Sequence, residues 1–416
     1  MRILIAGQTY YPAFNGQSIF MTNLAEGLAQ RGHDVLVVVP STEGPADQKE
    51  VHGVRIQAIK SVQLSFLHQG VFYTPLPGRA IRRIVNTFKP DIVHIHDHYP
   101  ISRAVVMAAK HAGIKTVGTN HFMPENLMPY LPFPGEMKQS FDWVLWQWML
   151  ELYNRLDVAT APSRTAAAIL RRQGLVKPVY PISCGVDSRR FHVQTDIDRS
   201  AWRRRYGLDP NKILFLFVGR VDGEKRLDVL IRALSHLQND NIQLGIVGRG
   251  AAMEKLKALA VEQGVGKQVH FTGFVPDEHL PALLNSTDIF AMPSEAELLS
   301  IASLEAMSCG RPVLAAHARA LPELVNEGVN GYLFQPGNAQ DAARYMALLA
   351  NHPARWQSMG AASLEKARLH SLNRTLQSYE KVYGTVSEKA SFPYQQPNKR
   401  AGRRIKRKIR ESIDQL

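Results

Sequence analysis

Four charged residues in the second half of the chain have types and spacings that suit a phosphorylated sugar compound. Arg220 and Lys225 belong to "VGRVDGEKRLDVL", where an apolar run ends at a glycine and a helical pattern follows. Cations and free backbone amides at the start of a helix form a favourable site for a diphosphate. Glu297 and Glu305 belong to "PSEAELLSIASLEAMSCG". Carboxylates of this kind accept hydrogen bonds from the hydroxyls of a ribose or a sugar.

Each of these features also has a plainer interpretation. Arg220 and Lys225 could belong to a solvated basic loop, and Glu297 could do no more than complement the dipole of the helix that follows it. The turn "GRG" at 248–250 would let a phosphate or a base approach the backbone. It is not the full dinucleotide fingerprint, because Met253 stands where the third glycine would be.

Histidines are concentrated in the first half of the chain. His121 in "VGTNHF" follows a predicted strand, where it could donate to a hydroxyl or polarise a reacting group, or serve as a hydrogen-bonded structural residue. The stretch "HIHDH" at 94–98 contains metal-binding residue types, but we find neither the spacing nor the further ligands of a di-metal hydrolase. We expect no metal there. His94 and His96 are expected to alternate along a buried strand that ends near Asp97 and His98.

The elements that must carry these residues follow a repeated strand–helix order. In the first half, apolar runs such as "RILIAG", "HDVLVVVP", "DIVHIH" and "VATAPS" alternate with helical patterns, and the order restarts near residue 210 with "KILFLFVGRV", "IQLGIVGRG" and "DIFAMPS". This alternation predicts an α/β fold of two doubly wound domains, each with a parallel sheet covered on both faces. Ligands of such sheets bind beyond the carboxyl ends of the strands.

We divide the chain at three places. Residues 1–185 are expected to form the first domain and residues 186–370 the second, each of a size that supports its own core. Residues 371–387 read as one more amphipathic helix that crosses back to the first domain. A proline-containing break then precedes a basic tail at 388–416.

The charge of the chain is concentrated in that tail. The whole chain carries a net charge of +14, of which the nine Lys/Arg and three Asp/Glu of residues 388–416 contribute +6. Within 399–416, Ile405, Ile409, Ile413 and Leu416 form one apolar stripe along a helical pattern, with cations elsewhere. A basic amphipathic helix favours the surface of an anionic membrane, although a disordered tail or an RNA-binding arm would share this composition.

Composition restricts the cellular setting. The chain has two cysteines, Cys184 and Cys309, which are too few for a disulfide framework and suit a reducing compartment. It begins with "MRILIAG", which enters a strand directly, and we recognise neither a signal peptide nor a run of apolar residues that would span a membrane. We therefore expect a cytoplasmic protein that associates with a membrane peripherally.

The motifs together resemble those of one family. Residues 1 to about 385 resemble the GT-B-fold retaining glycosyltransferases of family 4 through "PAFNGQS", "TNH", "ISCGVD", "VGRVDGEK", "VGRG", "FTGFVP" and "PSEAELLSIASLEAMSCGRPVLA". The last motif is the most specific, with two glutamates separated by seven residues. The resemblance implies a hexosyltransferase that takes its sugar from a nucleotide donor, needs no metal or other cofactor, and retains the anomeric configuration.

The resemblance also implies roles for individual residues. Arg220 and Lys225 would hold the donor diphosphate and stabilise it as it leaves, Glu305 would bind the ribose, and Glu297 would lie beneath the transferred sugar. His121 would contact that sugar from the first domain. The other residues of the implied donor site are Gly16, Gly250, Val275, Leu298, Leu299 and Ser300.

Two departures from the family pattern concern the donor. Gln17 stands where a second glycine is usual in the first loop, and Leu298, Leu299 and Ser300 replace a Gly–aromatic–Gly sequence. Backbone amides remain available in both places, so the departures bear on donor sugar more than on reaction type. Glycolipid-forming members of the family, of the diacylglycerol glucosyltransferase type, resemble this variant.

The acceptor is inferred from the segment 119–150, which is rich in Met, Pro and Trp. Such a surface could bind acyl chains or a membrane, or the tryptophans could fill a core. With the basic tail, we expect transfer of glucose from UDP-glucose to diacylglycerol, without a nucleic-acid partner. A soluble sugar, a phosphoinositide or a polyprenyl-linked glycan remain alternative acceptors. The alternative outside enzymes is a module that binds sugar nucleotides or nucleic acid without turnover.

Overall fold

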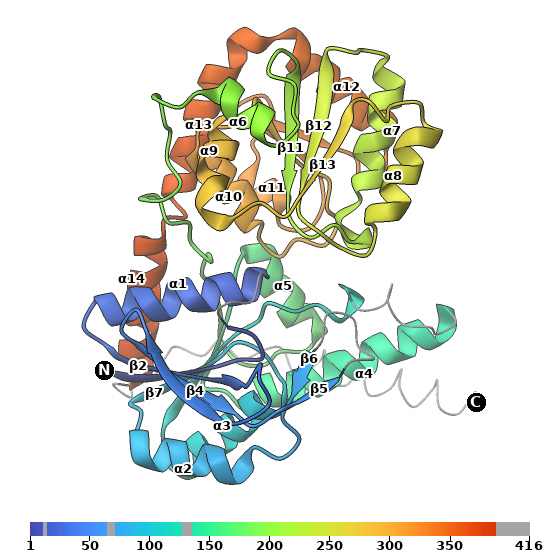
Figure 1. The fold of residues 1–416 in the computed structure, drawn as a ribbon. Coiled ribbons are helices and arrows are strands. Elements are labelled where there is room, and N and C mark those ends of the chain that lie inside the picture. Colours follow the sequence, from blue (N-terminus) through green and yellow to red (C-terminus); the bar gives the residue numbers. More distant parts are fainter. Residues whose placement is uncertain (11–14, 65–70, 127–134, 388–416) are drawn as a thin grey trace.

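The structure is a computed structural model that describes residues 1–10, 15–64, 71–126 and 135–387. Figure 1 shows two lobes, with the N-terminal one below and the C-terminal one above. The basic tail lies outside the described residues, so the expectation for 399–416 stays a prediction.

The N-terminal lobe is built on an eight-stranded sheet with the order β10-β9-β8-β7-β1-β2-β4-β3. Its strands are β1 (Arg2–Ala6), β2 (Asp34–Pro40), β3 (Asp47–Val51), β4 (Val54–Ile59), β7 (Ile92–Ile95), β8 (Lys115–Thr119), β9 (Val158–Ala161) and β10 (Val179–Pro181). A separate hairpin pairs β5 (Val62–Leu64) with β6 (Val71–Tyr73).

Helices cover this sheet. They are α1 (Gly16–Gln30), α2 (Gly78–Phe88), α3 (Pro100–His111), α4 (Gly135–Tyr153) and α5 (Arg164–Gln173), with a short 3₁₀ turn at Pro124–Asn126. Figure 1 shows α2 and α3 on the face opposite α1. Strands β1 and β7 are almost entirely buried, as expected for strands covered on both faces.

One edge of this sheet departs from the all-parallel arrangement that the strand–helix order predicted. Strand β3 pairs antiparallel with β4, while the other pairs in the sheet are parallel. The residues of β3 are exposed except at its end, and an antiparallel edge strand does not need two covered faces. Because "DQKEV" has a single apolar residue, Val51, at its end, its strand was missed from the sequence.

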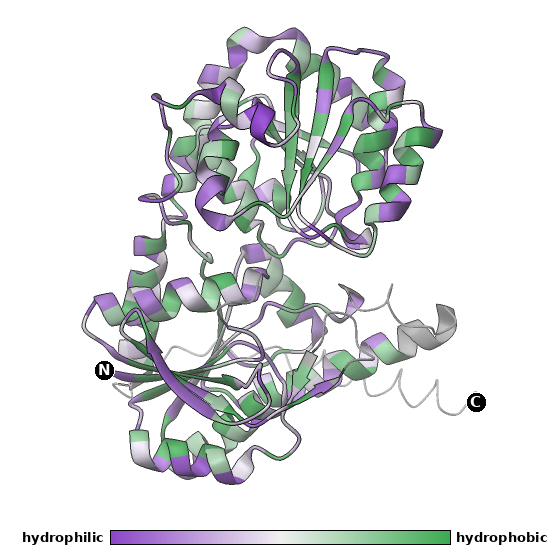
Figure 2. Cartoon of the chain, in the orientation of Figure 1, coloured by the Kyte–Doolittle hydropathy of each residue, from purple (hydrophilic) through white to green (hydrophobic). Residues whose placement is uncertain are grey.

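The C-terminal lobe contains a six-stranded parallel sheet with the order β13-β12-β11-β14-β15-β16. Its strands are β11 (Ile213–Val218), β12 (Ile242–Val247), β13 (Val269–Gly273), β14 (Ile289–Met292), β15 (Val313–Ala316) and β16 (Gly331–Phe334). Figure 2 shows that β11 and β12 are predominantly hydrophobic, while the surrounding helices alternate between hydrophilic and hydrophobic residues. The second doubly wound domain predicted from the sequence is thus confirmed.

The helices of this lobe follow the strands as predicted. They are α6 (Arg199–Arg205), α7 (Leu227–Leu237), α8 (Met253–Glu262), α9 (Leu280–Asn285), α10 (Ile301–Ser308), α11 (Leu321–Leu324), α12 (Ala339–Asn351) and α13 (Trp356–Arg368). Three short 3₁₀ turns lie at Gly223–Lys225, Asp277–His279 and Pro353–Arg355.

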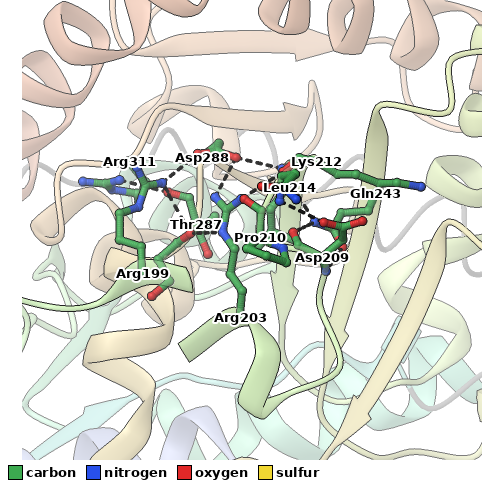
Figure 3. Close-up of polar contacts among 12 residues, drawn as sticks. Arg199, Arg203, Asp209, Pro210, Lys212, Leu214, Gln243, Thr287, Asp288 and Arg311 are labelled. Atoms are coloured by element: carbon green, nitrogen blue, oxygen red, sulfur yellow. Dashed lines mark hydrogen bonds and ion pairs between the residues drawn. The ribbon is translucent and has the colours of Figure 1, made fainter. Parts of the chain in front are cut away.

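Three arginines stabilise the end of this sheet where β14 begins (Figure 3). Asp288 accepts hydrogen bonds from Arg199 at 2.7 Å and from Arg203 at 2.8 Å, and Arg203 is only 5% exposed. Arg311 donates to the carbonyl of Thr287 at 2.9 Å. The guanidinium groups thereby satisfy carbonyls that follow the C-terminus of α9, which favours cations.

A last helix, α14 (Leu372–Ser387), returns to the N-terminal lobe (Figure 1). Its Glu380 accepts from Arg31 at 2.7 Å and lies 3.1 Å from a ring nitrogen of His33. The hydroxyl of Tyr383 lies 2.8 Å from Nδ1 of His94. The domain boundaries at 185, 370 and 387 remain our proposal, but the helix expected after residue 371 is present.

Candidate active site

Arg220 and Lys225 lie on the loop that follows β11. Gly219 has a φ of +156°, and the 3₁₀ turn Gly223–Lys225 leads into α7. A neighbouring backbone approaches closely, since a Cβ on Gly248 would lie 1.9 Å from the carbonyl oxygen of Gly219. Only glycine fits there, which explains why the loops after β11 and β12 begin with one.

Both cations are paired with carboxylates. The Nζ of Lys225 lies 2.7 Å from Glu297 Oε1 and 3.4 Å from Glu224 Oε1. Arg220 bonds to Glu224 at 2.6 Å and also contacts Asp222. We call these five residues the ion cluster. Burial opposes the charge of Lys225, but the two glutamates outweigh burial and raise its pKa.

Asp222 joins the ion cluster to the next loop. Besides contacting Arg220, its carboxylate accepts from the backbone amide of Ala251 at 3.1 Å. Asp222 is buried. Sequence reasoning counted the two cations of "GRVDGEK" and missed the acids between them. Their spacing from Arg220, at two and four residues, was the signal that could have identified them.

Gly250 lies on that next loop, at a point of close approach. A Cβ on Gly250 would lie 2.3 Å from the carbonyl oxygen of Val221. Gly250 also lines a pocket of about 270 Å³ together with Arg249, Met253, Lys257, Phe271 and Gly273. The nearby Val275 is buried. The pocket lies where β12 and β13 end, as ligand sites of doubly wound sheets do.

Glu297 does not cap the helix that follows it. The N-cap of α10 is Ser300, whose hydroxyl accepts from the amide of Ser303 at 3.2 Å. Glu297 is therefore not the N-cap of α10, and its carboxylate pairs with Lys225 instead. The same geometry gives the side chain of Ser300 a structural task within α10.

The loop that carries Glu297 packs against the N-terminal lobe. Leu298 belongs to the same buried cluster as Met123 and Trp146 of that lobe, while Leu299 belongs to a second cluster that contains the core of its own lobe. Ala296 and Phe122 pack against the same cluster as Leu298. Since Phe122 follows His121 directly, the loop of Glu297 and the "TNHF" segment meet at the boundary between the lobes.

Glu305 lies on α10, one turn beyond the loop. Burial raises the pKa of its carboxyl to about 8, with Arg190 acting in the opposite direction and Asp277 in the same one. Its side chain is half-buried, and among the described residues none donates a hydrogen bond to this carboxylate. A hydroxyl donor would favour the ionised form and lower the pKa.

Gly16 is the first residue of α1. Asn15 and Ser18 form a capping box, in which the amide of Ser18 donates to Asn15 at 2.9 Å and the amide of Asn15 donates to the hydroxyl of Ser18 at 3.1 Å. A Cβ on Gly16 would meet Ile301 of α10 at 4.0 Å. The start of α1 thus faces the start of α10.

Gln17 has a partner that accounts for its place beside Gly16. Its Nε2 donates to Asp97 at 3.3 Å. Asp97 also accepts from the hydroxyl of Ser102 at 2.7 Å and from the amide of Tyr99 at 3.0 Å. Burial raises the pKa of Asp97, and these hydrogen bonds oppose the rise. The side chain that stands in place of the second glycine therefore connects the start of α1 to the end of β7.

His121 belongs to a cluster with His94 and His96, which we call the histidine cluster. His96 Nδ1 lies 3.2 Å from His121 Nε2, and His94 lies 2.8 Å from Tyr383 and 2.7 Å from Thr119. Burial lowers the pKa of His94 and of His121 to about 3, and that of His96 well below its ordinary value. These rings are therefore neutral near pH 7, and the rings of His96 and His121 are hydrogen-bonded to each other.

Two family models match successive parts of the chain. One is described as Glycosyltransferase Family 4 and matches residues 14–190, and the other is described as Glycosyl transferases group 1 and matches residues 198–366. The two matches meet in the segment between β10 and α6.

Individual proteins match over most of the chain. The sulfoquinovosyl transferase SQD2 of Arabidopsis thaliana is 28% identical over 83% of this chain, which spans 65% of that protein. A GDP-mannose-dependent alpha-(1-6)-phosphatidylinositol dimannoside mannosyltransferase of Mycobacterium tuberculosis is 27% identical over 78% of this chain and 82% of its own. HepE of Anabaena, solved in complex with UDP-glucose, superimposes with a TM-score of 0.73 at 20% identity, covering 92% of this chain and all of its own. With both family models matched in order, and with two parallel sheets in the arrangement called GT-B, the chain belongs to the glycosyltransferases of group 1 and family 4.

Proposed function

We propose that this enzyme transfers glucose from UDP-glucose to a lipid acceptor, diacylglycerol, with retention of configuration. The observation that carries the donor side is the ion cluster. It places Arg220 and Lys225 on one loop and joins Lys225 to Glu297 at 2.7 Å. A diphosphate would replace the internal carboxylates as the partner of both cations and would leave Glu297 to accept from the sugar hydroxyls.

The remaining donor contacts fit the same ligand. Glu305 has a half-buried carboxyl with a raised pKa that the hydroxyls of a ribose would satisfy, and the pocket beside Gly250 is suited to the base. The complex of HepE with UDP-glucose supports UDP-glucose as the first donor to test. The cations on the loop after β11 stabilise charge as it develops on the leaving diphosphate, which fits a transfer that needs no metal.

The acceptor side is supported by the surface of α4. Trp146 is buried in the core, whereas Trp143 is 55% exposed and Trp148 is 40% exposed. The guanidinium of Arg103 lies 4.6 Å from the centre of a Trp148 ring. Exposed tryptophans with a cation nearby are typical of surfaces that enter the headgroup region of a membrane. Among the described residues, no helix combines the length and apolarity needed to cross a bilayer.

A donor-by-acceptor panel tests this proposal. Enzyme is incubated with labelled UDP-glucose or GDP-mannose and with vesicles containing diacylglycerol or phosphatidylinositol, or with soluble sugars. We expect label in the lipid phase with UDP-glucose and diacylglycerol. Label found in a soluble product alone, or in phosphatidylinositol alone, would contradict the acceptor and leave the enzyme class intact.

Glu297→Ala separates catalysis from binding in the same assay. Because Glu297 faces the sugar and the cations face the diphosphate, transfer should fall by about 10²- to 10³-fold while UDP still binds. Isothermal titration with UDP measures the binding, and Glu295→Ala on the same loop is the control. Loss of UDP binding in Glu297→Ala would assign Glu297 to the diphosphate site instead.

The proposed membrane contact of residues 399–416 has its own test. Deleting this basic segment should weaken sedimentation with anionic vesicles at low salt and reduce the salt dependence of binding, because screening acts on exposed charges. Transfer to a short-chain, water-soluble diacylglycerol should be unchanged. Equal binding of the deleted and full chains would reject the membrane role of this segment.

A further inference from the structure

In the histidine cluster, the surroundings of His96 Nε2 determine which ring nitrogen of His121 carries the proton. His96 is only 1% exposed, and its Nε2 has no hydrogen-bond partner in the described part of the chain. Its Nδ1 lies 3.2 Å from His121 Nε2. His96 therefore makes one side-chain hydrogen bond, and that bond connects it to His121.

The two rings meet edge to edge. Their planes differ by 13° and their centroids are 5.4 Å apart. Two imidazole rings stacked face to face would be closer, whereas an in-plane N–H···N bond at 3.2 Å places the centroids about this far apart. One nitrogen of the pair must donate and the other must accept, since burial keeps both rings neutral.

Two proton arrangements satisfy that bond. In the first, His121 donates from Nε2, so that His96 carries its own proton on the buried, unpartnered Nε2. In the second, His96 donates from Nδ1 to His121 Nε2. The buried Nε2 of His96 then carries a lone pair and no proton, and His121 carries its proton on Nδ1. In proteins, a buried N–H without an acceptor is rarer than a buried acceptor without a donor, because leaving the N–H unpaired in an apolar environment costs free energy. The second arrangement is favoured.

We propose that His96 is a positioning residue that donates from Nδ1 to His121 and thereby holds His121 in the tautomer with its proton on Nδ1. His121 then presents an N–H donor to the transferred sugar. This inference rests on the proposed function for the sugar contact, but the tautomer of the free enzyme does not depend on it. Phe20 packs 5.0 Å from the His121 ring and limits its rotation.

Nitrogen-15 NMR of histidine-labelled protein tests the tautomer without any substrate. Long-range proton–nitrogen correlations distinguish Nδ1–H from Nε2–H rings, and His121→Asn identifies the signals of His121. We expect the Nδ1–H tautomer at pH 7 in the free enzyme. The Nε2–H tautomer, or a doubly protonated ring, would overturn the proposal, whatever the donor and acceptor prove to be.

A matched pair of variants tests the consequence. His96→Asn keeps an N–H donor near the position of Nδ1, while His96→Leu has similar size and no donor. We expect the kcat of His96→Leu to fall roughly tenfold and that of His96→Asn to stay within about threefold of wild type, with little change in donor KM. Equal kcat in the two variants would show that His96 acts by packing alone. If no panel member is a substrate, the proposed function fails while the NMR result still decides the tautomer.

Discussion

The ion cluster of the C-terminal lobe and the histidine cluster of the N-terminal lobe are both partly or fully enclosed, but they satisfy their polar groups differently. In the ion cluster, carboxylates accompany Lys225 and Arg220, and the glutamates beside Lys225 raise its pKa. In the histidine cluster, burial removes the charges and the neutral rings bond to each other and to hydroxyls. Under the proposed function, the ion cluster would receive the anionic part of the donor and the histidine cluster a neutral part.

This difference matches the two ends of a nucleotide sugar. A diphosphate brings its own negative charge and can replace Glu224 and Asp222 as the partner of the cations. A sugar brings hydroxyls, for which a charged imidazolium would be a needless desolvation cost. The contrast therefore explains why acids surround the cations and why no acid pairs with His121 among the described residues.

The largest effect is expected from breaking the ion cluster. Lys225→Ala removes a cation from the leaving diphosphate and leaves Glu297 without its partner, so kcat should fall by about 10²- to 10³-fold. Steady-state kinetics with the donor measure this. Lys255→Ala, on the exposed surface of α8, is the control and should retain wild-type rates. A near-normal kcat of Lys225→Ala would contradict the role of the ion cluster in holding the diphosphate.

A smaller effect is expected from Glu305. Like the rings of the histidine cluster, its side chain has a pKa that is shifted toward the neutral form. Its pKa of about 8 lies above the ordinary value of 4.5, so the folded chain binds the proton more tightly than the unfolded chain. Its contribution to stability is thus fully present below pH 4.5 and is lost as the pH rises to about 8. Glu305→Gln mimics the neutral acid and should not show this loss.

Thermal unfolding from pH 5 to pH 9 measures that difference. We expect the Tm of wild type to fall relative to Glu305→Gln by a few degrees over this range. Saturating UDP should reduce the gap if the ribose satisfies the ionised carboxylate. A gap that does not change with pH would mean that Glu305 does not change its protonation state between pH 5 and pH 9.

The smallest effect is expected at the outer end of the histidine cluster. Tyr383→Phe removes the hydroxyl next to His94 Nδ1 and should cost about 1–2 kcal/mol of stability, because a buried nitrogen loses its partner. Chemical denaturation measures the change, with Tyr345→Phe as a half-buried control. Activity should be almost unaffected, since Tyr383 does not contact His121. A large loss of activity would show that the bond between Tyr383 and His94 affects His121.

The sequence predicted the parts of this architecture that rest on local pattern. Apolar runs and glycine turns identified the strands that carry Arg220, Glu297 and His121, and helical periodicity placed Glu305 on a helix. It missed what depends on distant partners. Gln17 contacts Asp97, and His96 bonds to His121, although the members of each pair are far apart along the chain. The type of a residue does not indicate which distant residue it will contact. The acids Asp222 and Glu224 were overlooked although they are adjacent to the cations they neutralise.

The return of α14 to the N-terminal lobe has a consequence for how the chain is made. Tyr383 reaches His94 across 289 residues, so the first lobe to leave the ribosome lacks a partner for its buried histidine until nearly all of the described chain has been synthesised. Domains usually fold as they emerge, and contacts this distant form late. The surroundings of His94 in the N-terminal lobe are therefore complete only after the last helix has been synthesised.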